Sequence, residues 1–142
     1  MVLVTAVERA GLSLLVCRAE AGAGLISAGL AWEAGIPSLI ITITSPGVYG
    51  AMQALHLARE NRIPLVLLSG ETSIPGSIQA GDGVDGAACT RITAPLTAWS
   101  ADITRPRAVP GALQRAVRLA SSLGRPVHLN IAVDVAATEV GS

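Results

Sequence analysis

The sequence contains no lysine, no phenylalanine and little charge. Only 14% of its 142 residues are charged, against about 25% in ordinary domains, and ten arginines balance ten acidic residues. A chain with neither net charge nor a basic cluster has little to hold a phosphate backbone, so we expect no nucleic-acid partner. The apolar share of 51% excludes a disordered chain.

Cysteine is also scarce, and the long apolar runs are interrupted. Two cysteines, Cys17 and Cys89, cannot form a disulfide scaffold, and their small or apolar neighbours predict reduced thiols in a cytoplasmic protein. The longest uncharged stretch, residues 34–58, is broken by two prolines, which argues against a membrane span. No basic segment precedes an apolar core at the N-terminus, so we expect no secretory signal. We therefore expect residues 1–142 to form one cytoplasmic domain with no membrane partner.

Short apolar runs alternate with helical patterns along the chain. Continuous runs of about six apolar residues predict buried strands, and apolar residues three or four apart predict helices. The predicted strands are residues 12–17, 38–44, 64–69, 96–100 and 127–133, and the predicted helices are residues 2–10, 20–33, 48–60, 86–92 and 106–122. In the last helix Leu113, Val117 and Ala120 should face inward, and Arg115 and Arg118 outward. This alternation predicts a three-layer α/β/α fold with a mainly parallel sheet.

Glu20 is the acidic residue most suited to a functional role. It directly follows a predicted apolar strand, and it opens a helix that carries no other charge before Glu33. An isolated carboxyl group at such a junction is typical of a site for proton chemistry. It is equally typical of an acid in the first turn that complements the helix dipole. The residues by themselves leave both interpretations open.

Three further patterns point to no site. The glycines at Gly22, Gly24 and Gly29 lack the GxGxxG spacing of a dinucleotide site. The triplet at residues 81–83 has the form of a metal-binding GDG motif, but no asparagine pair follows it, so a turn is predicted. His56 and His128 have no Cys, His or carboxylate at ligand spacing and are expected to be structural.

Five segments match, in order, the motifs of one known family. They are Val16–Gly24 with Ser27–Ala31, Thr44–Gly47 with Ala51 and Leu55, Ile63–Gly70, Pro95–Ser100, and Gly124–Ile131 with Asp134 and Val135. The chain thereby resembles the pyrimidine-binding domain of thiamine diphosphate-dependent enzymes, especially their acetolactate synthase and 2-oxo-acid decarboxylase branch. The resemblance covers residues 3–136 and aligns Glu20 with the glutamate of the family's first motif.

The sequence departs from the family pattern at several positions. Ala19 stands where the family has histidine, Gly50 where it has asparagine, and Ala98 where it has lysine. The middle glycine of the family's TSGPG motif is absent. The family's opening helix, first strand and FGxPG loop have no counterpart, so the sheet is expected to lack that first strand.

The resemblance implies a cofactor, thiamine diphosphate, and a role for each of four residues. In the family the glutamate hydrogen-bonds N1′ of the aminopyrimidine ring and so promotes removal of the thiazolium C2 proton. Glu20 would have this role, and Pro46, Gly47 and Gly50 would contact the cofactor. The family holds the diphosphate and Mg²⁺ on a second domain. The resemblance therefore implies a separate diphosphate-binding subunit that carries Mg²⁺, in a heterotetramer with two copies of each chain.

Two hypotheses about function follow from the resemblance. In the first, the chain is a subunit, inactive alone, of a decarboxylase or acetolactate-synthase-like carboligase that acts on a 2-oxo acid. In the second, it is a non-catalytic scaffold or regulatory module of the same fold. The retained Glu20 favours the first, and the departures at Ala19, Gly50 and Ala98 favour the second. Under the first hypothesis, much of the weakly charged surface around residues 20–31 and 46–58 should be interface.

Overall fold

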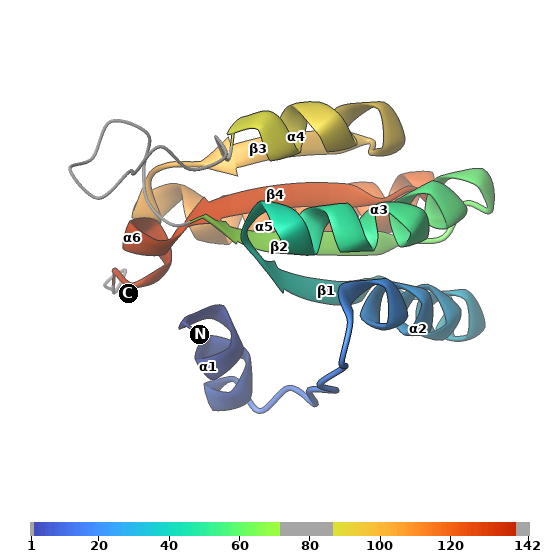
Figure 1. Cartoon of the computed structure of the whole chain (residues 1–142), viewed down its shortest axis with the longest axis horizontal. Coiled ribbons are helices and arrows are strands. Elements are labelled where there is room, and N and C mark those ends of the chain that lie inside the picture. The colour runs from blue at the N-terminus through green and yellow to red at the C-terminus, as the bar shows by residue number, and fades with distance from the viewer. Residues whose placement is uncertain (1, 72–86, 139–142) are drawn as a thin grey trace.

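The computed structural model describes residues 2–71 and 87–138, which form helices around a parallel β-sheet (Figure 1). The strands of this part are β1 (Ser38–Ile43), β2 (Leu65–Glu71), β3 (Trp99–Ile103) and β4 (Val127–Ala132). They pair in the order β1-β2-β4-β3, and all three pairings are parallel. Every residue of β4 is buried, as expected for a central strand covered on both faces. β1 lies at one edge of the sheet.

Helices cover both faces of the sheet, which confirms the predicted three-layer α/β/α fold. On one face lie α2 (Glu20–Ala34), α3 (Thr44–Glu60) and α4 (Ala87–Thr93), whose apolar residues pack with Ile40, Leu65 and Leu67. On the other face lie α5 (Val109–Leu123), α6 (Val133–Ala136) and α1 (Val2–Arg9), around Val66, Leu68 and Leu129. None of the helices in the described residues is long and apolar enough to cross a membrane.

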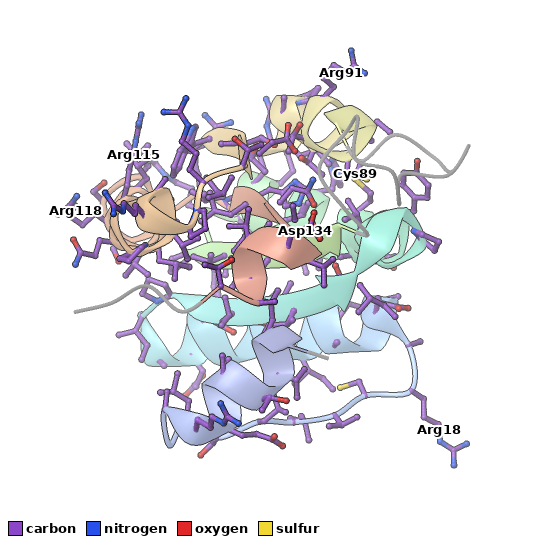
Figure 2. All side chains as sticks on the ribbon, turned by 90° about the vertical axis from the view of Figure 1, so that its left-hand side faces the viewer. Arg18, Cys89, Arg91, Arg115, Arg118 and Asp134 are labelled. Carbon is purple, nitrogen blue, oxygen red and sulfur yellow. The ribbon has the colours of Figure 1, made fainter. Side chains whose placement is uncertain are left out.

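The helix α5 packs through small side chains. Its buried residues are spaced four apart and are Ala112, Ala116 and Ala120. A row at this spacing lies on one side of a helix and brings the helix axis close to the sheet. The prediction for Val117 was wrong, because this side chain lies beside the alanine row and is 47% exposed. Arg115 and Arg118 do point outward, as predicted (Figure 2).

The predicted strand at residues 12–17 is absent. This segment is irregular, and its apolar side chains are open to solvent, with Leu12 59% and Val16 83% exposed. A strand is stable only beside another strand, and the segment pairs with neither β1 nor any other strand of the described residues. Between residues 2 and 37 the structure contains α1 and α2 and no strand.

Residues 45–47, which the sequence predicts to be a turn between the strand at residues 38–44 and the helix at residues 48–60, are helical instead. α3 begins at Thr44 and includes Ser45, Pro46 and Gly47 in its first turn. Proline is tolerated there because the first amide groups of a helix have no intrahelical acceptor to bond. The consequence is that Pro46, Gly47 and Gly50 all lie on one helix.

The predicted strand at residues 96–100 is displaced. Pro95 lies in a 3-10 turn, Ala94–Leu96, and the strand β3 starts only at Trp99. A similar 3-10 turn, Pro106–Ala108, precedes α5. The GDG triplet at residues 81–83 lies outside the described residues.

Candidate functional site

Glu20 lies at one of the close contacts between α2 and α3. It is the first residue of α2, partly buried, and it faces two glycines one turn apart on α3. A Cβ added to Gly50 would lie 2.9 Å from the Cβ of Glu20 and 3.5 Å from its Oε2. A Cβ added to Gly47 would lie 3.6 Å from the Cγ of Glu20. The structure thus brings together three of the four candidate site residues, while Pro46 is exposed in the same turn of α3.

The Glu20 carboxyl has no ion-pair partner in the described residues. Arg18, the nearest basic residue in sequence, projects into solvent away from the body of the protein (Figure 2). The N-cap of α2 is Ala19, which offers no side-chain hydrogen bond to the helix. Glu20 therefore complements the positive end of the α2 dipole, and its carboxyl group stays available for other contacts.

Thr42 of β1 is a neighbour of this site that sequence reasoning missed. Its side chain is only 3% exposed, and its Oγ1 is the one buried side-chain nitrogen or oxygen of the described residues that has no hydrogen-bond partner. A Cβ added to Gly47 would lie 2.8 Å from the Cβ of Thr42 and 3.4 Å from its Oγ1. An unpaired buried hydroxyl costs about 1–3 kcal/mol, so this one needs an explanation.

Thr42 is the first member of a row of polar side chains that crosses the sheet. It is in register with Ser69 of β2, Ser69 with Asn130 of β4, and Asn130 with Asp102 of β3. Residues in register on parallel strands project from the same face. The row therefore lies on the face that carries α2, α3 and α4.

Beyond Thr42 the row is closed by hydrogen bonds. Ser69 Oγ donates to Asn130 Oδ1 at 2.7 Å, and Asn130 Nδ2 donates to Asp102 Oδ1 at 2.9 Å. Thr90 of α4 donates through Oγ1 to the other carboxylate oxygen of Asp102, also at 2.9 Å. These bonds fasten the short helix α4 to the sheet.

His128 joins the same network from β4. Ser69 Oγ lies 2.8 Å from His128 Nε2, and because the one Ser69 proton goes to Asn130, Nε2 carries a proton and donates. Thr93 Oγ1 lies 2.7 Å from Nδ1 and donates to it when the ring is neutral. Burial lowers the pKa of His128 from 6.5 to about 4, and the charge of Asp102 opposes part of this shift. His128 is therefore neutral at pH 7, and the predicted structural role is confirmed.

The other candidate ligands and nucleophiles are dispersed. His56 is exposed on α3, Cys89 is buried, and Cys17 is partly exposed. Cys17 and Cys89 form no disulfide, in agreement with the prediction of reduced thiols. In the two described ranges, no three side chains of His, Cys, Asp or Glu come together as metal ligands would.

The chain is similar to proteins that use thiamine diphosphate. Residues 1–89 match the family model described as thiamine pyrophosphate enzyme, N-terminal TPP binding domain. The chain is 34% identical over 135 residues to a "probable 2-ketoarginine decarboxylase" of Pseudomonas aeruginosa, covering 92% of this chain and 24% of that protein. It is 30% identical over 123 residues to the acetolactate synthase isozyme 1 large subunit of Escherichia coli, covering 85% and 21%.

A solved structure supports the same relationship. The crystal structure of benzoylformate decarboxylase from Polynucleobacter necessarius matches 92% of this chain with a TM-score of 0.78 and 26% sequence identity, and the match spans 24% of that chain. The chain thus spans about a quarter of the length of these relatives. With the family model matched over more than half of its residues, the chain belongs to the thiamine pyrophosphate enzyme family, in which it corresponds to the N-terminal TPP-binding domain.

Proposed function

We propose that this chain is the pyrimidine-binding subunit of a thiamine diphosphate-dependent 2-oxo-acid decarboxylase or acetolactate-synthase-like carboligase. Glu20 is its catalytic carboxylate. The observation that carries the proposal is the contact of the Glu20 side chain with the α3 backbone at Gly47 and Gly50. The Glu20 carboxyl group forms no ion pair in the described residues. The reaction class follows the relatives described above, which are an acetolactate synthase and two decarboxylases.

The residues at this site fit the pyrimidine ring of the cofactor. The ring needs a hydrogen-bond acceptor at N1′ and a surface without bulky side chains. Glu20 supplies the acceptor, and Gly47 and Gly50 present α3 without a Cβ. Pro46 is exposed one residue earlier and offers an apolar contact. When bound, thiamine diphosphate supplies a nucleophilic carbon and an electron sink.

Glu20 acts by holding a proton at N1′ of the pyrimidine. A carboxylate only accepts hydrogen bonds, so it selects the ring form that has a proton at that nitrogen. The two residues of α3 that lie against it, Gly47 and Gly50, have no side-chain donor that could compete. Water must also be excluded, because a solvated carboxylate interacts more weakly. Because Glu20 is only partly buried in this chain, a second surface must cover it to exclude water.

That second surface belongs to a diphosphate-binding subunit, which also carries Mg²⁺. The outer side of α2 supports this assignment because it carries exposed, large apolar side chains. They are Leu25, Ile26, Leu30 and Trp32, at 41%, 44%, 60% and 63% exposure. Clustered exposed apolar residues of this kind mark interaction sites. The simplest assembly has two copies of each chain, with each active site between a Glu20 and a partner surface.

The proposal is tested with the complex. The tagged chain is purified from its source organism, and a co-purified chain is accepted as partner only if its sequence contains a GDG segment followed by an asparagine pair. The complex is then assayed with thiamine diphosphate, Mg²⁺ and a panel of 2-oxo acids. Glu20→Gln should lower turnover at least about 100-fold, since it removes the acid–base group. Glu33→Gln, on the same helix, should stay within about twofold.

Two outcomes contradict the proposal in different ways. If the Glu20→Gln complex turned over substrate at nearly the wild-type rate, Glu20 would have no catalytic role. A complex in which the partner has the same activity with and without this chain would instead favour the scaffold or regulatory module. The absence of histidine at Ala19 is the observation that keeps this alternative in view.

A further inference from the structure

We propose that Thr42 is a positioning residue for Glu20: its hydroxyl donates a hydrogen bond to the Glu20 carboxylate in the assembled site. The inference rests on the proposed function of Glu20. It starts from the unpartnered Oγ1 of Thr42, which is buried on β1 beneath the first turn of α3.

The Thr42 hydroxyl and the Glu20 side chain both lie close to the position that a Cβ of Gly47 would occupy. Thr42 Oγ1 is 3.4 Å, and Glu20 Cγ 3.6 Å, from the point that a Cβ of Gly47 would occupy. The carboxylate oxygens of Glu20 lie two bonds beyond Cγ. Rotation of the Glu20 side chain can therefore turn one oxygen toward Thr42. With any other residue at position 47, the Cβ would collide with Thr42 at 2.8 Å and occupy the space between hydroxyl and carboxylate.

Within residues 2–71 and 87–138, Thr42 Oγ1 has no hydrogen-bond partner. Its neighbour in register, Ser69, donates to Asn130 and accepts from His128. Other buried hydroxyls are bonded within the chain. Thr97 Oγ1, for example, donates to the Thr93 carbonyl oxygen at 3.1 Å. Among the buried side-chain hydroxyls of the described residues, only that of Thr42 has no hydrogen-bond partner. This difference indicates that the Thr42 hydroxyl bonds to a group that comes into reach only in the assembled site.

A donor at this place has a clear use. A carboxylate has two oxygens, so one can face the pyrimidine while the other accepts from Thr42. The second bond fixes the side-chain torsions of Glu20 and holds the catalytic oxygen toward the ring. A hydrogen bond to a charged group is strong enough for its loss to cost about tenfold in rate.

The first test measures the steady-state kinetics of the complex with Thr42→Val, which replaces the hydroxyl by a methyl group. We expect kcat to fall about tenfold, while KM for the 2-oxo acid and the affinity for thiamine diphosphate stay within about twofold. The acid limb of the pH–rate profile should move to higher pH, because the carboxylate has lost a donor. Thr42→Ser should restore most of the rate. Thr97→Val, a matched buried threonine away from the site, should leave the rate unchanged.

A double variant separates this inference from the proposed function. If Thr42 acts through Glu20, Thr42→Val adds nothing to the loss in Glu20→Gln. Equal losses in both backgrounds, or Thr42→Ser as slow as Thr42→Val, would overturn the positioning role and leave Glu20 catalytic. If Glu20→Gln has no effect on turnover, the proposed function itself fails.

A second test needs neither cofactor nor partner. In urea unfolding of the chain alone, Thr42→Val should leave the midpoint unchanged or raise it, because the lost hydroxyl has no partner there. Thr97→Val should lower the midpoint, because it removes a bonded hydroxyl. A midpoint for Thr42→Val lowered as much as that for Thr97→Val would show that the hydroxyl already serves the fold, and would overturn the proposal.

Discussion

The two ends of the polar row across the sheet differ in one respect. From Ser69 through Asn130 to Asp102, every side chain is hydrogen-bonded within the chain. At the other end Thr42 is buried like Ser69 and Asn130, yet its hydroxyl has no partner in the described residues, and Glu20 lies nearby. A closed polar network specifies a structure, whereas a group left open indicates a contact that the chain cannot make alone. We infer that the hydrogen-bonded end of the row serves the structure and that the Thr42 end serves the site.

The apolar surface shows the same division. β4 and its neighbours are covered on both faces, and β4 is buried throughout. At the other edge, Leu39 and Ile43 of β1 are 42% and 54% exposed, and the outer side of α2 is apolar and open. We infer that most of the stability comes from the β2–β4–β3 part, and that the α2–β1 edge is left for binding.

The largest effect on the free energy of unfolding is expected from removing His128 from the hydrogen-bonded network. His128→Leu removes one hydrogen-bond partner of Ser69 and one of Thr93, and both hydroxyls are buried. We expect the free energy of unfolding to fall by about 3 kcal/mol, measured by urea denaturation of the chain alone. His56→Leu, at an exposed position of α3, should change it by less than about 0.5 kcal/mol. Equal effects of the two variants would mean that the network does not hold the fold.

The next effect tests how closely α2 packs on α3. A Cβ at Gly24 would lie 2.6 Å from the Cβ of Ala54, so Gly24→Ala must push the two helices apart. We expect a loss of about 2 kcal/mol in the free energy of unfolding. In the complex, turnover should fall as well, because Glu20 is on the same helix. A stable Gly24→Ala variant with normal turnover would show that the contact between α2 and α3 can relax without moving the site.

The pH dependence of stability gives a smaller effect. The pKa of His128 is lowered to about 4 in the folded chain, below the 6.5 of the unfolded chain. Between these values the unfolded chain binds more protons, so stability is complete above pH 6.5 and is lost as the pH falls toward 4. The limiting slope is about 1.4 kcal/mol per pH unit for one proton.

This dependence is measured as a difference between two proteins. Urea unfolding at pH 7, 6 and 5 should show the wild type losing its advantage over His128→Leu as the pH falls. Other titrating groups are common to both proteins and cancel in the difference. A constant difference over this range would mean that His128 keeps an ordinary affinity for protons in the folded chain.

Much of the fold could be predicted because its signals are local. The runs at residues 38–44, 64–69 and 127–133 are mainly apolar, and each became a strand within two residues of the predicted bounds. The run at residues 12–17 has the same local signal and is no strand, because strand formation also requires a neighbour. That requirement depends on the whole sheet and cannot be read from six residues.

The site divides in the same way. The family resemblance identified Glu20, Gly47 and Gly50, and the structure places them in contact, although their roles remain predictions. Thr42 was missed because it is one threonine in a β-branched run, where threonine is common. Its significance depends on the register with Ser69 and on an absent bond, and both are properties of the folded chain.

The smallest expected effect tests the open side of α2. A Cβ at Gly29 meets nothing within 4 Å, and the same holds for Gly111 in the first turn of α5, on the opposite face of the sheet. Alanine is a better helix former than glycine, so Gly29→Ala and Gly111→Ala should each raise the free energy of unfolding by up to about 1 kcal/mol. Urea denaturation of the chain alone measures both gains.

The same two variants then locate the interface. The added methyl of Gly29→Ala lies on the side of α2 that we assign to the partner, near the exposed Leu30 and Trp32. Gly29→Ala should therefore weaken binding of the diphosphate-binding subunit several-fold, measured by titration of purified chains. Gly111→Ala should bind as the wild type does, because α5 lies on the other face. If both variants bind equally well, the exposed side of α2 is not the surface that completes the site.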